Sequence, residues 1–96
     1  MIPGLTTKVS ESQLVAAATI TPLTDVVYIT GTTALKTIVP PFGGFSGILV
    51  VVAQAGAGLS TLTTGNIALA VNMTTNVPVL FVWSLLNSKW YPGAIS

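Results

Sequence analysis

Short apolar runs alternate along the chain with clusters of turn residues. The two strongest runs are Gly47–Ala53 and Pro78–Leu86, which are rich in β-branched or aromatic side chains and about as long as a strand. Runs of this kind, bounded by turn residues, predict strands rather than helices. The second run alternates, with Val79, Phe81, Trp83 and Leu85 on one side and Leu80, Val82 and Ser84 on the other.

Shorter segments with strand character surround these two runs. They cover residues 18–23, 25–30, 34–39, 59–63, 66–71 and 89–92. Thr64-Gly65-Asn66 predicts a turn between the two segments that flank it, because Gly and Asn tolerate positive φ. Asn87-Ser88 predicts a hairpin that folds the last segment back on its predecessor. We therefore expect one all-β domain, an antiparallel sandwich or jelly roll of six to eight short strands.

The start of the chain differs from the Thr-rich remainder. The first 15 residues hold Lys8 and Glu11, two of the five charges in the chain. We interpret residues 1–16 as an extended N-terminal arm that precedes a β domain at residues 17–96. A frayed terminus is the alternative interpretation. The residues that we expect to bind a neighbouring surface are Ile2, Pro3, Leu5 and Val9.

The composition predicts that the domain does not stand alone. Hydrophobic residues make up 51% of the chain and charged residues 5%, against about 25% charged residues in a typical globular domain. We expect another subunit to cover the apolar surface that five charges leave unsolvated. A Thr-rich monomeric sandwich is the alternative. The candidates for a trimer interface are Val50, Val52, Phe81 and Trp83.

Several classes of function find no support in the residues. The apolar runs are too short for a membrane-spanning helix, and the polar beginning does not resemble a secretion signal. The net charge of +1 gives no electrostatic basis for binding nucleic acid. Gly56 and Gly58 lack the following Lys of a phosphate-binding loop.

Catalytic and metal-binding chemistry is poorly represented as well. The chain has no His and no Cys, and its two acidic residues, Glu11 and Asp25, are 14 positions apart. General acid–base and nucleophilic catalysis ordinarily need such groups close together. We predict no enzyme, no metal and no cofactor. The aromatic side chains Tyr28, Trp83, Trp90 and Tyr91 suit either a core or stacking on a sugar or base.

Six short motifs follow one another between residues 18 and 92. They are Thr19-Ile20-Thr21-Pro22, Ile29-Thr30-Gly31-Thr32-Thr33, Gly47-Ile48-Leu49-Val50-Val51, Leu59-Ser60-Thr61-Leu62-Thr63, Gly65-Asn66-Ile67-Ala68-Leu69-Ala70 and Lys89-Trp90-Tyr91-Pro92. This order resembles a structural module of tailed-phage virion proteins, which occurs in tailspikes, tail fibres and capsid decoration proteins. One departure is Leu85-Leu86-Asn87-Ser88, where the module more often has an Asp-Gly turn.

The resemblance implies a non-catalytic virion protein that forms a homotrimer. The short chain favours a decoration, or cement, protein on the capsid surface, bound to the major capsid protein and stabilising the head shell. The alternative is a tail fibre or tailspike tip that binds a host-surface receptor or glycan. Exposed aromatic side chains in a groove would favour the tip, and buried ones would favour the decoration protein.

Overall fold

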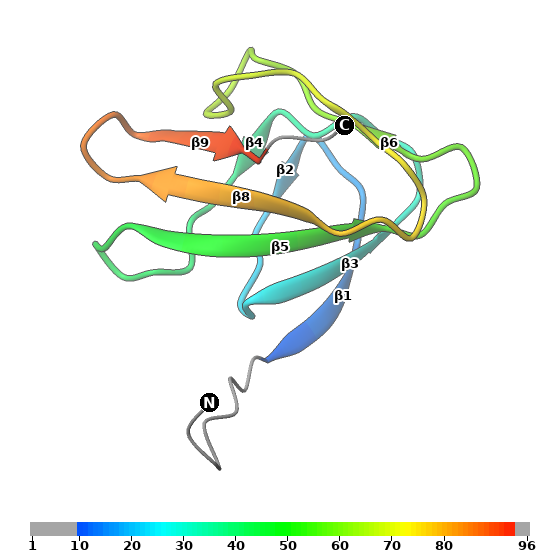
Figure 1. The fold of residues 1–96 in the computed structure, drawn as a ribbon, viewed down its shortest axis with the longest axis horizontal. Helices are drawn as coiled ribbons and strands as arrows, with labels where there is room; N and C mark the ends of the chain where they lie inside the picture. The colour runs from blue at the N-terminus through cyan, green and yellow to red at the C-terminus, as the bar shows by residue number, and fades with distance from the viewer. Residues whose placement is uncertain (1–9, 94–96) are drawn as a thin grey trace, which may run out of the picture.

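The computed structural model describes residues 10–93, in which strands and loops form one β structure without helices (Figure 1). The all-β prediction is confirmed. The strands are β1 (Glu11–Val15), β2 (Thr19–Ile20), β3 (Val26–Thr30), β4 (Thr37–Ile38), β5 (Gly47–Ala53), β6 (Leu59–Ser60), β7 (Asn72–Met73), β8 (Val79–Ser84) and β9 (Lys89–Pro92).

The main sheet has five strands in the order β1-β3-β5-β8-β9 and is mixed rather than antiparallel. The predicted hairpin is confirmed, because β8 pairs antiparallel with β9, and β5 pairs antiparallel with β8. The antiparallel prediction is wrong for the other half, where β1, β3 and β5 pair in parallel. Parallel neighbours need crossover connections. Here the chain passes through β2 between β1 and β3, and through β4 between β3 and β5 (Figure 1).

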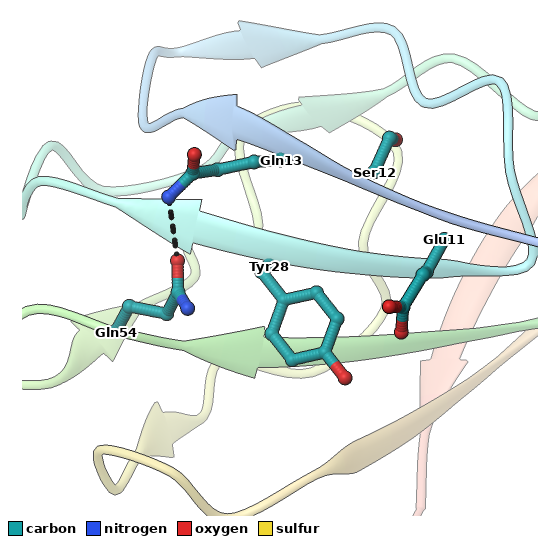
Figure 2. A pocket seen from close by; sticks show the side chains of 5 residues that line it. All are labelled: Glu11, Ser12, Gln13, Tyr28 and Gln54. Atoms are coloured by element: carbon teal, nitrogen blue, oxygen red, sulfur yellow. Dashed lines mark hydrogen bonds between the residues drawn. The ribbon is translucent and has the colours of Figure 1, made fainter.

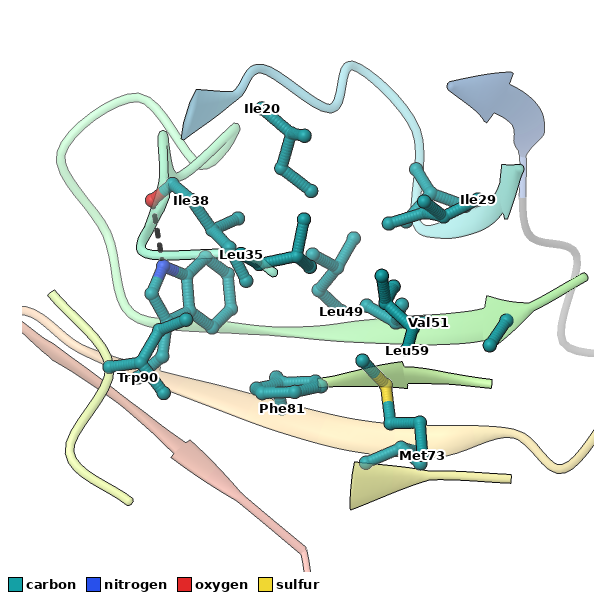
Figure 3. Packing of buried hydrophobic residues seen from close by; sticks show 14 of the residues in the cluster. Ile20, Ile29, Leu35, Ile38, Leu49, Val51, Leu59, Met73, Phe81 and Trp90 are labelled. Carbon is teal, nitrogen blue, oxygen red and sulfur yellow. Dashed lines mark hydrogen bonds between the residues drawn. The ribbon is translucent and has the colours of Figure 1, made fainter. Parts of the chain in front are cut away.

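These crossovers build a second, less regular layer. Its short strands pair as β2 with β4 in parallel and β6 with β7 antiparallel, and a bridge between Leu35 and Thr61 links the two pairs. One continuous hydrophobic core fills the space between this layer and the main sheet (Figure 3). Ile20, Leu35 and Ile38 enter it from the second layer, and Leu49 and Phe81 enter it from the main sheet.

The segment 66–71 does not form the strand that the sequence predicted. The partner of β6 is β7, which begins at Asn72. Asn66 instead uses its side-chain amide as a substitute for a strand neighbour of β4. Its Oδ1 accepts a hydrogen bond of 2.9 Å from the Ile38 backbone nitrogen, and its Nδ2 donates one of 2.7 Å to the Ile38 oxygen.

The main sheet begins inside the segment expected to be an arm. Glu11–Val15 form β1, paired with β3 from the Glu11–Val26 pair to the Val15–Thr30 pair. Backbone bonds extend the pairing at both ends, from Val26 N to Ser10 O (3.0 Å) and from Ala16 N to Thr30 O (2.7 Å). The prediction of an arm over residues 1–16 is therefore wrong for Glu11–Val15, which belong to the sheet. The expected contact residues Ile2, Pro3, Leu5 and Val9 lie outside the described residues.

Candidate functional site: the outer face of the main sheet

The second layer covers one face of the main sheet and leaves the opposite face, here called the outer face, open. Strand alternation decides which side chains reach it. On β5, Leu49, Val51 and Ala53 enter the core, so Ile48, Val50 and Val52 point outward. The pairing register continues these rows across the sheet, because Val50 lies between Val26 and Leu80, and Ile48 lies beside Val82.

Exposed apolar side chains gather on the outer face over β5, β8 and β9. The exposed fraction is 52% for Ile48, 45% for Leu80 and 41% for Val82, and Tyr91 pairs beside Val82. Half-buried Val50 lies between Ile48 and Val52 on the outer face of β5, the central strand. The surface therefore presents hydrocarbon to solvent where a monomer would ordinarily place polar groups.

The patch continues around one end of the sheet. The loop before β5 and the turn Leu85–Ser88 after β8 are joined there, because the Leu85 backbone nitrogen donates a hydrogen bond of 3.0 Å to Ser46 Oγ (Figure 1). Leu86 is 92% exposed at this end, and Phe45 is largely exposed as well. We call the whole surface the apolar patch, made of Phe45, Ile48, Leu80, Val82, Leu85, Leu86 and Tyr91.

The structure divides the four residues predicted to form a trimer interface between the two faces. Phe81 and Trp83 belong to the core, where Phe81 is fully buried, so they are not available to another subunit. Val50 lies on the outer face, and Val52 is there too but only 7% exposed. The predicted alternation along β8 is correct. The interface was assigned to the side of Phe81 and Trp83, which faces the core, whereas Leu80 and Val82 face solvent.

A shallow polar hollow of about 370 Å³ lies on the same face, over the first part of β1 and the middle of β3 (Figure 2). Its lining residues are Glu11, Ser12, Gln13, Tyr28 and Gln54. Gln13 extends from β1 across β3 and donates a hydrogen bond of 2.9 Å from Nε2 to Oε1 of Gln54, at the end of β5. The hollow thus combines side chains from β1, from β3 and from the residue after β5. These three strands are the ones that pair in parallel.

The Glu11 carboxylate and the Tyr28 phenol lie on the other side of the hollow (Figure 2). The pKa of Tyr28 is raised above its ordinary value of 10.0, first by hydrogen bonding with the Glu11 side chain and second by the negative charge of that carboxylate. Both causes favour the neutral phenol, which remains available as a hydrogen-bonding group.

The two tryptophans are structural. Trp90 is fully buried and lies near Phe42, Phe81 and Trp83, with ring centroids 5.8, 6.4 and 5.3 Å away. Their burial agrees with the core interpretation of these aromatic residues. Tyr28 and Tyr91 differ, because both reach the outer face.

The sequence identified Tyr28 as a candidate for stacking but not the residues around it. Gln13 and Gln54 are 41 positions apart, and their meeting depends on the parallel pairing of β1, β3 and β5. The glycine-rich loop after β5 forms a separate hollow with Asn72–Thr75, again without a lysine among its lining residues.

Searches for known relatives of this fold and site give no match. The chain matches no protein-family model, no curated protein and no solved structure. In residues 10–93, no three His, Cys, Asp or Glu side chains come together in a way that would hold a metal ion. That same part of the chain contains no helix with the length and apolar character of a membrane span.

Proposed function

We propose that the chain is a non-catalytic structural protein of a tailed-phage virion, a homotrimer that decorates the capsid and stabilises the head shell by binding the major capsid protein. The observation that carries the proposal is the apolar patch. The motif order between residues 18 and 92 supplies the phage assignment and the trimer.

The apolar patch suits a permanent subunit contact. Monomeric proteins rarely expose contiguous apolar areas above a few hundred Å², and larger ones mark interfaces. Half-buried Lys89 is the one charged residue on β8 and β9, so charge does little to keep this part of the face in water. Burying Ile48, Leu80 and Val82 would each contribute roughly 1 kcal/mol, since about half of each side chain is already covered.

The shape of the patch is compatible with a closed ring. It has two distinct parts, the sheet face around Val82 and the end of the sheet around Phe45 and Leu86. When the end of one subunit packs on the face of the next, the contact is heterologous, and such contacts form a ring where the rotation between subunits closes and an open filament where it does not. A closed ring leaves neither part exposed, and the number of three subunits comes from the resemblance of the motifs.

Sedimentation equilibrium tests the assembly. We expect a trimer of the 9.8 kDa chain at micromolar concentration, and Val82→Lys should shift it to monomer because it places a charge within the contact. Thr19→Lys is the matched control, since Thr19 is exposed on β2 in the opposite layer. A wild-type monomer, or equal dissociation of both variants, would contradict the proposed contact.

Attachment to the capsid needs a separate experiment. Heads produced without the gene for this chain would be incubated with the purified protein, sedimented and labelled for electron microscopy. The residues proposed for attachment are Ile2, Pro3, Leu5 and Val9, so a deletion of residues 1–9 should weaken binding to such heads. The deletion stops short of Glu11 because Glu11–Val15 belong to the sheet.

A tail fibre or tailspike tip is the second candidate function. The polar hollow favours it, because Tyr28 is an aromatic side chain in an open depression beside amide and carboxylate groups. The burial of Trp83 and Trp90 favours the decoration protein. Labelling on tails rather than heads would replace the first candidate with the second.

A further inference from the structure

The hollow is built of side chains that carry complementary hydrogen-bonding groups. The bond from Gln13 Nε2 to Gln54 Oε1 holds the two amides together across β3. It leaves the Gln13 carbonyl oxygen and the Gln54 amino group without a hydrogen-bond partner within residues 10–93. An acceptor and a donor are thereby presented at the two opposite ends of the bonded pair (Figure 2), each amide held in place by the other.

We propose that this hollow binds a neutral saccharide, with the amides of Gln13 and Gln54 and the Glu11 carboxylate bonding to its hydroxyl groups and the Tyr28 ring contacting its C–H face. Each sugar hydroxyl both donates and accepts, so one hydroxyl can donate to the Gln13 oxygen while another, farther along the saccharide, accepts from the Gln54 amino group. Carboxylate acceptors form the stronger, charge-assisted bonds.

The charge of the hollow selects against other small ligands. Glu11 is the one charged residue that lines it, so phosphates, sulfates and acidic sugars would meet repulsion rather than a counter-charge. A divalent cation would find a single carboxylate and neutral oxygens, fewer charged ligands than tight sites use. A neutral polyhydroxylated ligand meets neither penalty.

The floor of the hollow suits the apolar side of a sugar ring. Tyr28 pairs on one side with Gln13 and on the other with Val52, so the phenol ring stands beside a valine side chain. The phenol proton is directed to the Glu11 side chain, and the Tyr28 oxygen can still accept a hydrogen bond from a sugar hydroxyl. The hollow is shallow and open, so it can hold one monosaccharide unit at the end or along the side of a longer glycan.

The site is separate from the apolar patch. Tyr28 pairs with Val52, and the nearest patch residue, Leu80, pairs with Val50 two positions earlier on β5, whereas Ile48 and Val82 lie farther along the sheet. A subunit contact centred on Val82 and Leu86 therefore leaves the hollow accessible. The inference does not depend on the virion assignment, and it holds for a decoration protein or a tail tip alike.

The test is nuclear magnetic resonance of the full chain with millimolar cellotetraose, maltotetraose and chitotetraose. We expect at least one of them to shift the side-chain amide signals of Gln13 and Gln54 and the backbone signal of Tyr28. Gln54→Ala should weaken that binding at least about tenfold, the effect of losing one good hydrogen bond and the ordering of its partner. Thr63→Ala, an exposed polar residue elsewhere, should leave the binding unchanged.

Two further variants separate this proposal from its rivals. Glu11→Gln should reduce saccharide binding. In the wild-type chain, stronger binding of an acidic tetrasaccharide than of the neutral ones would overturn the proposal. Val82→Lys should keep saccharide binding even if it dissociates the trimer, so failure of the proposed assembly and failure of the sugar site are distinguishable. The absence of shifts at the hollow with all three neutral probes would also overturn it.

Discussion

The indole nitrogen of Trp90 donates a hydrogen bond of 2.8 Å to the backbone oxygen of Ile38, 52 positions earlier in the chain. The same oxygen accepts a second bond from the Asn66 side chain. The last strand of the main sheet is thereby tied to the second layer through a polar contact inside an otherwise apolar core (Figure 3). Burial of the indole requires such a partner, because an unpaired N–H in the core costs free energy.

Replacement of this donor should destabilise the domain. Trp90→Phe removes the bond to Ile38 and leaves space in the core, so we expect a loss of about 2–4 kcal/mol in the free energy of unfolding. Urea unfolding followed by circular dichroism measures it. Tyr91→Phe is the control, since it removes an exposed bond from Asn87 and should cost less than about 0.5 kcal/mol. Equal midpoints for the two variants would show that the indole bond is not stabilising.

Gly47 is required by a close approach rather than by its backbone angle. A Cβ at this position would lie 2.6 Å from the ring of Phe42, which packs near Trp90. Gly47→Ala should therefore displace Phe42 and cost about 1–3 kcal/mol. Thermal unfolding of Gly47→Ala is compared with Gly56→Ala, where an added Cβ meets no atom within 4 Å. A melting temperature that falls equally in both variants would contradict the packing argument.

Phe81 tests which face of β8 is inside. Phe81→Ala should cost about 3–5 kcal/mol, enough to leave much of the chain unfolded, because the side chain is fully buried. Leu23→Ala is the control, since Leu23 is largely exposed and should change stability by less than about 0.5 kcal/mol. Far-ultraviolet circular dichroism and urea titration measure both. A stable Phe81→Ala domain with an altered oligomeric state would restore Phe81 as an interface residue.

The pKa of Tyr28 should depend on the neighbouring Glu11 carboxylate, and a pH titration measures this dependence. The raised pKa means that the folded chain holds the phenol proton more tightly than the unfolded chain. This contribution to stability is complete below the ordinary tyrosine pKa and is lost as the pH rises through the pKa of folded Tyr28. In a Tyr91→Phe background, phenolate absorbance follows Tyr28 alone. Glu11→Gln should lower the Tyr28 pKa, whereas Asp25→Asn, which changes the other acidic residue, should not.

Local pattern was sufficient to determine the element types of the two strong apolar runs and of the last hairpin, but not of β1 or of residues 66–71. The apolar runs at Gly47–Ala53 and Pro78–Leu86 predicted β5 and β8, and the Asn87-Ser88 signal predicted the hairpin into β9. The alternation along β8 separated Phe81 from Val82 correctly. These features depend on neighbouring residues and on the period of two in a strand, which a sequence displays directly.

Tertiary structure alone decided which side of the sheet is covered and how strands pair. Alternation assigns two faces to β8 but does not say which one the second layer covers, so Phe81 and Trp83 were placed at an interface and lie in the core. The parallel pairing of β1, β3 and β5 depends on crossovers between distant segments. The hollow follows from that pairing, because Gln13 and Gln54 meet only when β1 and β5 flank β3. Contacts of such long sequence separation leave no periodic signal in the chain.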